Sequence, residues 1–130
     1  IVIDKNMAIP TNFHLFDQSQ PTIIFNSLVE NKEENLDIVK LDFSNKVLPQ
    51  IIDYLYQQNI QSIIIEGGSD TIQYFIDANI WDEARVLSSD SIWNEGILAP
   101  RIRGTRIAKH RFLNDELNIF ENRIEEEPYN

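Results

Sequence analysis

Residues 63–74, which read IIIEGGSDTIQY, contain the best candidates for chemistry in this sequence. Gly67 and Gly68 can adopt positive φ angles and allow a ligand to approach the backbone closely. The N–H groups of residues 68–71 would then begin a helix, where unpaired donors and the positive end of the helix dipole attract anions. This order of residues predicts a phosphate-binding turn.

A plainer interpretation of the same turn stays open. Pairs of glycines are common in tight turns, and Ser69 or Asp70 could serve as the N-cap of the helix. Two adjacent glycines are less specific than a complete phosphate-binding motif. The charge of Asp70 would also repel a phosphate unless its side chain points away. The residues of the turn by themselves therefore predict either a tight turn or an anion site.

Glu66 follows three isoleucines, so its carboxylate is expected at the end of a buried strand. A buried carboxylate needs hydrogen-bond partners. Glu66 could cap nearby backbone N–H groups, or it could face a polar cleft and bind an N–H or O–H group of a ligand. Both alternatives are open.

The elements that must position these residues follow from the hydrophobic pattern. Apolar and β-branched runs predict strands at residues 1–4, 22–27, 37–41, 61–65 and 83–89. Apolar residues at helical spacing predict helices at residues 46–59 and 69–79. Ser44 or Asn45 would cap the first helix, and the polar stretch 29–36 is predicted to be a solvated turn. Two closing antiparallel strands are expected around a turn at Asn114 and Asp115.

This order of elements predicts an α/β protein. Two strand–helix–strand units favour parallel neighbours, so we expect a mixed, mostly parallel sheet with flanking helices and a C-terminal antiparallel hairpin. No linker or repeat interrupts the chain, and residues 1–130 are expected to form a single compact unit. Because the chain starts with Ile1 inside an apparent strand, we expect it to be part of a longer gene product.

Composition restricts the class of function. The 130 residues carry a formal net charge of −10, which disfavours binding to nucleic acid and to anionic membranes. The sequence has no cysteine, which fits the cytoplasm, and no apolar run is long enough to span a bilayer. His14 and His110 are far apart and have no metal-ligand spacing, so no metal site is predicted.

Three other features each have two interpretations. Asp82 and Glu83 could be a catalytic pair, but local hydrogen bonds beside a turn are favoured. Trp81 and Trp93 are favoured as packing or interface residues rather than as cofactor-stacking residues. The basic cluster could bind phosphate, but a solvated face or a subunit contact is favoured; its members are Arg101, Arg103, Arg106, Lys109 and Arg111.

The segment LYQQNIQSIIIEGGSDTIQYFIDANIWDEARV resembles the C-terminal reductase domain of the bacterial bifunctional riboflavin-biosynthesis deaminase/reductase. The most specific part of the similarity is the EGG motif at Glu66 with a DE pair that begins at Asp82. The IVID start and the pattern at Gly96, Ala99 and Pro100 are also similar. The similarity covers most of residues 1–112.

The resemblance implies a dihydrofolate-reductase-like fold, incomplete at its N-terminus, within a longer bifunctional enzyme. It implies NADPH-dependent reduction of 5-amino-6-(5-phosphoribosylamino)uracil to the ribitylamino compound, with NADPH as cofactor. Glu66 would contact the substrate, and no side chain would act as a catalytic nucleophile. The implied cofactor-binding residues are Lys5, Gly67, Gly68, Ser69, Asp70, Thr71, Ile72, Gln73 and Tyr74.

Two departures from the family pattern bear on these expectations. Lys5 stands where the family often has a small hydroxyl residue, and the segment SSDSIWNEG replaces a proline-containing strand end. Because part of the reductase domain and the deaminase half would precede Ile1, the chain alone is expected to bind poorly, and whether it is active alone is left open. The family suggests a homodimer. The alternative to an enzyme is a non-catalytic nucleotide-binding or dimerisation module derived from the same fold.

Overall fold

The computed structural model describes residues 1–92 and 94–123, so Trp93 and the C-terminal tail lie outside the described residues. The described chain divides into two compact units, of which the first is Ile1–Ile63 and the second begins at Ile64. Each unit is described by itself below. The single domain expected over residues 1–130 stays a prediction.

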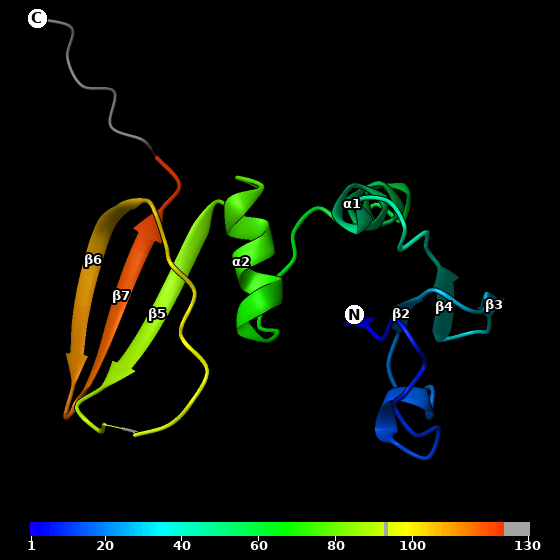
Figure 1. Ribbon diagram of the computed structural model, residues 1–130, viewed down its shortest axis with the longest axis horizontal. Helices are drawn as coiled ribbons and strands as arrows, with labels where there is room; N and C mark the ends of the chain where they lie inside the picture. The colour runs from blue at the N-terminus through cyan, green and yellow to red at the C-terminus, as the bar shows by residue number, and fades with distance from the viewer. Residues whose placement is uncertain (93, 124–130) are drawn as a thin grey trace, which may run out of the picture. The chain divides into compact units, whose positions relative to one another are not determined.

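The first unit is built on a four-stranded sheet (Figure 1). Its strands lie in the order β1-β2-β4-β3, with β1, β2 and β4 parallel and β3 antiparallel to β4. Their bounds are Val2–Ile3 for β1, Thr22–Asn26 for β2, Asn31–Lys32 for β3 and Leu36–Lys40 for β4. The strands predicted at residues 1–4, 22–27 and 37–41 are confirmed, whereas the stretch predicted as a solvated turn contains β3.

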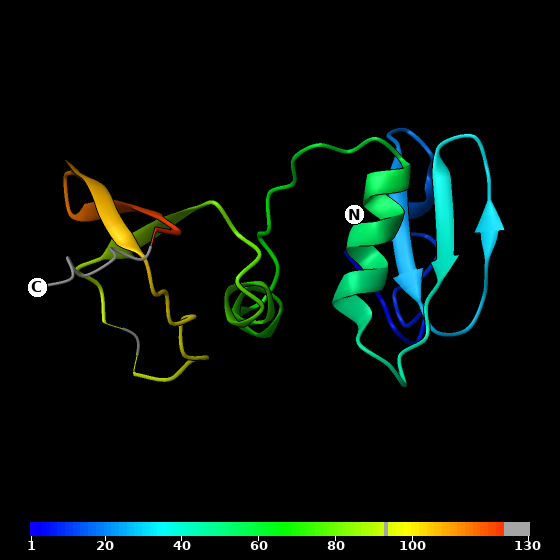
Figure 2. The ribbon, with the colours of Figure 1, turned by 90° about the horizontal axis from the view of Figure 1, so that it is seen from above.

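Helix α1, Val47–Gln57, covers one face of this sheet (Figure 2). Its predicted apolar stripe packs on the sheet, because Ile51 and Leu55 share a buried cluster with Phe25 and Leu41. The rings of Phe25 and Tyr54 meet edge to face with centroids 5.5 Å apart, a favourable arrangement of aromatic quadrupoles. Burial of this stripe holds the helix on the sheet.

The start of α1 differs from the prediction. The N-cap position is Lys46, and no side chain caps the helix. Ser44 and Asn45, the predicted caps, instead donate their side-chain hydrogen bonds to the carboxylate of Asp42. Both side chains therefore form local hydrogen bonds with Asp42 instead of capping α1.

The second unit contains one helix and an antiparallel sheet with the strand order β5-β7-β6 (Figure 1). The helix is α2, Ser69–Asp77, and the strands are β5, Glu83–Ser89, β6, Thr105–Phe112, and β7, Asp115–Glu121. The predicted hairpin is confirmed, but Asp115 pairs with Phe112 inside it. The turn therefore lies at Leu113 and Asn114, with Leu113 at a φ of 55°.

Two expectations about parallel pairing are wrong. Residues 61–65 form no strand, and β5 pairs with β7 in the antiparallel sense. Ile63 packs against the core of the first unit, whereas Ile64 is 87% exposed. An apolar run indicates burial but does not supply a strand partner, and no described strand pairs with these residues.

The predicted fold class is confirmed. The structure has a mostly parallel sheet, two helices and a C-terminal antiparallel hairpin, which is a mixed α/β arrangement. Within the described residues, neither helix has the length and apolar character that crossing a membrane would require.

Gly104 generates a stability prediction. A Cβ at this position would lie 2.6 Å from the backbone oxygen of Glu121 and 2.6 Å from a ring atom of Trp81, so Trp81 has the predicted packing role. Gly104→Ala should destabilise the protein by about 1–3 kcal/mol through overpacking. Gly96→Ala is the control, because its added Cβ meets nothing within 4 Å, and it should change stability by less than about 0.5 kcal/mol. Equal unfolding midpoints of the two variants in urea would contradict this packing.

Tyr54 generates a prediction for alkaline pH. Its hydroxyl donates a 2.8 Å hydrogen bond to Asp37, and burial followed by this hydrogen bond raises the pKa of Tyr54 to about 12. Between about pH 10 and 12 the unfolded state therefore ionises at this residue while the folded state stays protonated, so stability falls as pH rises. Tyr54→Phe should lose less stability than the unmodified protein over this interval, measured by urea unfolding. Parallel pH profiles would refute the assigned pKa.

Candidate functional site

The glycine turn precedes α2, and Gly68 is the N-cap residue. Gly68 has a φ of −47° and a ψ of 164°, and no side chain caps the helix. The alternative in which Ser69 or Asp70 is the N-cap is therefore wrong. Because no side chain takes the capping position, the first amides of α2 keep the donors that an anion could accept from.

The two glycines do not adopt the positive φ angles that the sequence suggested, since none is found among the described glycines. Packing does not require them either. A Cβ at Gly67 would make ordinary contact with Thr71 at 3.6 Å, and a Cβ at Gly68 would meet nothing within 4 Å. The backbone and its neighbours thus tolerate side chains at both positions. The remaining physical reasons for glycine are close approach of a ligand and, at Gly68, the favourable N-cap propensity of glycine.

Glu66 differs from expectation. Its side chain is exposed and makes no hydrogen bond with any residue in the described ranges. The premise of a buried carboxylate is wrong because residues 61–65 do not form a buried strand. The role of Glu66 as a substrate contact stays a prediction that rests on the resemblance.

The other predicted cofactor residues on α2 have different surroundings. Ile72 is half-buried, whereas Tyr74 is 44% exposed. Gln73 accepts a 2.7 Å hydrogen bond from the N–H of Arg101 and donates one to Asp77. Its amide thus connects α2 to the segment before β6. Asp70 is exposed in the first turn of α2. The positive end of the helix dipole stabilises a negative charge at this position.

A pocket that the sequence did not predict lies in the first unit. It is open, has a volume of about 630 Å³, and is lined by Lys5, Ser27, Lys40, Leu41, Asp42, Phe43 and Ser44. These residues follow or end β1, β2 and β4. Ligands of open α/β sheets sit beyond the carboxyl ends of parallel strands. The ends of the predicted strands could therefore have indicated this pocket. Lys5 is the predicted site residue in this pocket.

Hydrogen bonds tie the strand ends around the pocket together. The Ser27 hydroxyl and the Ser27 N–H both donate to the carbonyl oxygen of Lys5, at 2.8 and 2.9 Å. The N–H of Leu41 donates to the carbonyl oxygen of Asn26 at 2.8 Å. These contacts continue the order of the sheet beyond the strands and give the pocket a fixed base.

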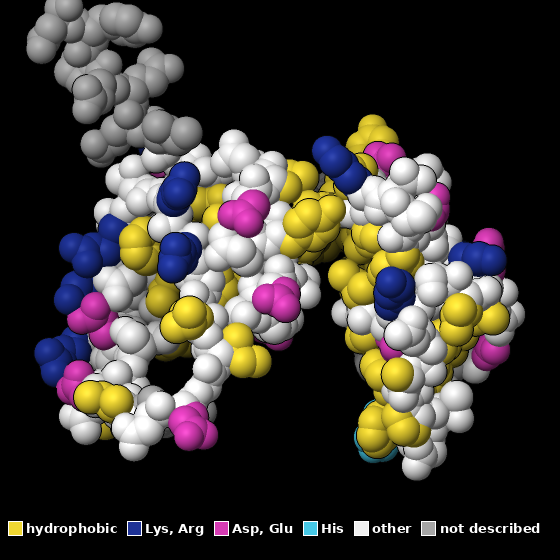
Figure 3. Space-filling view, viewed as in Figure 1, with side chains coloured by type: hydrophobic (Ala, Val, Ile, Leu, Met, Phe, Trp, Pro, Cys, Tyr) yellow, Lys and Arg dark blue, Asp and Glu magenta, His cyan; other side chains and the backbone are white. Residues whose placement is uncertain are grey.

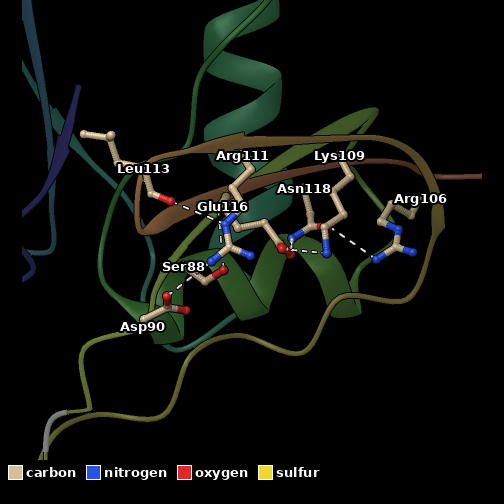
Figure 4. Close-up of polar contacts among 8 residues, drawn as sticks. All are labelled: Ser88, Asp90, Arg106, Lys109, Arg111, Leu113, Glu116 and Asn118. Carbon is tan, nitrogen blue, oxygen red and sulfur yellow. Dashed lines mark hydrogen bonds and ion pairs between the residues drawn. The ribbon is translucent and has the colours of Figure 1, made fainter.

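The basic cluster is largely engaged with neighbouring polar groups (Figure 4). Lys109 forms a 2.6 Å ion pair with Glu116, and Arg111 approaches Asp90 at 3.4 Å. The hydrogen bond from Lys109, followed by one from Asn118, lowers the pKa of Glu116. Figure 3 shows acidic and basic side chains interspersed over the second unit, to which this cluster belongs. The arrangement favours a solvated strand face, as expected.

The remaining candidates have local partners. Glu83 accepts a 2.7 Å hydrogen bond from Arg85, so the local hydrogen bond favoured for this residue is confirmed. His14 contacts Asp17 at 2.9 Å and is exposed. In the described part of the chain, no three His, Cys, Asp or Glu side chains are grouped as metal ligands.

Comparison with known proteins identifies the family. The sequence pattern of the RibD C-terminal domain matches residues 1–91, well over half of the chain. The chain belongs to the RibD C-terminal domain family. The matched residues of this RibD C-terminal domain include both the pocket and the glycine turn.

A solved structure supports the fold of this RibD C-terminal domain. The riboflavin biosynthesis reductase Rib7 of Saccharomyces cerevisiae is similar with a TM-score of 0.70 and 15% sequence identity. The similarity covers 92% of this chain and 67% of the yeast protein. The dihydrofolate-reductase-like fold implied by the resemblance is therefore confirmed. The family assignment also confirms the expected class of function, a reductase domain of riboflavin biosynthesis.

Proposed function

We propose that this RibD C-terminal domain takes part in the NADPH-dependent reduction of 5-amino-6-(5-phosphoribosylamino)uracil. The proposal rests on the family assignment, and the observation that carries it beyond the family is the pocket at the carboxyl ends of three parallel strands. This is the place where α/β sheets bind nucleotides. Once the sugar ring has opened to the imine, which breaks the ring C–O bond, the bound cofactor would supply a hydride to the sugar carbon attached to nitrogen, and a proton on that nitrogen would complete the amine.

The tasks left to the protein are binding and orientation. In the first unit, Lys5 is proposed to contact the cofactor from the pocket, where its carbonyl group is fixed by Ser27. In the second unit, the uncapped amides at the start of α2 are proposed to bind cofactor phosphates. Backbone donors suit an acidic protein, because they attract a phosphate without requiring basic side chains.

Glu66 is proposed to orient the substrate. Its exposed carboxylate has no partner among the described residues and is free to accept hydrogen bonds from substrate N–H or O–H groups. No nucleophilic side chain is required, because the bond-forming step is hydride transfer. The carboxylate would act by positioning the substrate.

A second copy of the chain is the proposed protein partner. The antiparallel sheet exposes large apolar side chains, with Leu87 73% exposed on β5 and Phe112 59% exposed on β6. Covering apolar surface of this kind with another protein removes it from water, which favours association. The cytoplasm is the proposed compartment, consistent with a sequence that has no cysteine.

Glu66→Gln tests the enzymatic proposal. The full-length gene product should oxidise NADPH when the pyrimidine substrate is added, followed by absorbance at 340 nm. Glu66→Gln should lower turnover about 100-fold, because misplaced substrate reacts slowly, while the Kd for NADPH stays unchanged. The control is Glu34→Gln, which removes an exposed charge outside the candidate site. If the unmodified protein shows no oxidation, the reductase proposal fails; if Glu66→Gln reacts normally, only the role of Glu66 fails.

Gly67→Ala and Gly68→Ala test the turn. Neither added Cβ meets a close contact, so both variants should fold, with Gly68→Ala losing at most about 1 kcal/mol from a poorer N-cap. Both should weaken NADPH binding roughly tenfold, because the Cβ occupies space proposed for a phosphate. Gly96→Ala has equally open surroundings and should bind normally. Unchanged Kd values for all three variants would show that the turn does not contact the cofactor.

A further inference from the structure

The pocket in the first unit contains two cations that have no ion-pair partner among the described residues, in a strongly acidic chain. Lys5 follows β1 and Lys40 ends β4, and both line the pocket. Neither lysine forms an ion pair with any residue that the structure describes. With a formal net charge of −10 for the whole chain, two ammonium groups without carboxylate partners in one pocket are a local exception that favours an anionic ligand.

The ammonium group of Lys5 has a defined environment. It lies 5.6 Å from the centroid of the Phe43 ring, within the range of a cation–π interaction. Phe43 in turn packs against the buried cluster beneath α1. The backbone of Lys5 is held by two hydrogen bonds from Ser27. The position of this cation is thus supported at both ends of its side chain.

The other polar side chains of the pocket are already engaged. The Ser27 hydroxyl donates to Lys5, and the Ser44 hydroxyl donates to Asp42. The Asp42 carboxylate also accepts from the N–H of Ser44 and from the side chain of Asn45. These bonds, led by the Ser44 hydroxyl, lower the pKa of Asp42. Lys5 and Lys40 are therefore the lining side chains whose donors remain for a ligand.

We propose that Lys5 and Lys40 bind the phosphate monoester on the adenosine ribose and thereby select NADPH over NADH. The inference rests on the proposed NADPH-dependent function and assigns Lys40 a role that the sequence motif did not suggest. A phosphate monoester carries nearly two negative charges at neutral pH, which matches two lysines. The competing outcome is that Asp42 accepts the free ribose hydroxyl of NADH, as an acidic residue does in many NAD-binding folds.

The test compares NADPH and NADH binding to the protein. Kd values should be measured by isothermal titration calorimetry for the full-length gene product, both unmodified and as the Lys5→Gln, Lys40→Gln and double variants. Each single substitution should weaken NADPH binding about tenfold, as expected for loss of a charge-assisted contact, and should change NADH binding less than about twofold. Lys46→Gln is the matched control, because it removes the same charge from a residue outside the pocket lining and should alter neither Kd.

Adenosine fragments isolate the phosphate. Adenosine 2′,5′-diphosphate should compete with NADPH, and 5′-AMP at the same concentration should not, because the two differ only in the monoester. Equal weakening of NADPH and NADH in the lysine variants, no weakening of either, or equal competition by both fragments would overturn the assignment. If the unmodified protein binds neither dinucleotide, the proposed function fails as well, which separates the two hypotheses.

Discussion

The buried pairing of β2 with its two parallel neighbours is the constraint on which the first unit depends. Ile24 and Phe25 have no exposed surface, so moving β2 by one residue would shift both side chains out of the positions in which they are buried. Asn26 then ends the strand with a fully buried amide. It donates to the carbonyl oxygens of Val29 and Val39 and accepts from the N–H groups of Leu28 and Val29. Because all four of its bonds are satisfied, this buried amide fixes where β2 stops relative to β4.

The pocket follows from that termination. Once β2 stops at Asn26 and β4 at Lys40, the residues that follow must turn away from the sheet, and their side chains line an open pocket. Ser27 holds the backbone of Lys5, and Asp42 collects the donors of Ser44 and Asn45. The local acid is thereby occupied by neutral donors, whereas the lysines are not neutralised. An acidic chain can in this way present a positively charged pocket.

Much of the candidate site could be predicted from the sequence. The EGG motif, its position before α2 and the resemblance carried by Glu66 and Asp82 were sufficient for the family. The physical reason first given for the glycines was wrong, because the backbone reaches α2 without positive φ angles. Lys40 carried no sequence signal beyond its place at a strand end, since one lysine at the end of a strand resembles any solvated residue. Its interest arises from sharing a pocket with Lys5, which is 35 positions away in the chain.

The sequence by itself determined the positions of both helices and of six strands, because hydrophobic periodicity reports which face of an element is buried. It also determined the family, through the spacing of a few motif residues. The tertiary structure decided strand pairing: β5 joined an antiparallel sheet, and residues 61–65 joined none. It also decided the capping of α1, where Asp42 took the side chains expected at the helix start. Periodicity records how strongly a segment avoids water, whereas pairing depends on which distant backbone groups are available as partners, and a single segment contains no information about them.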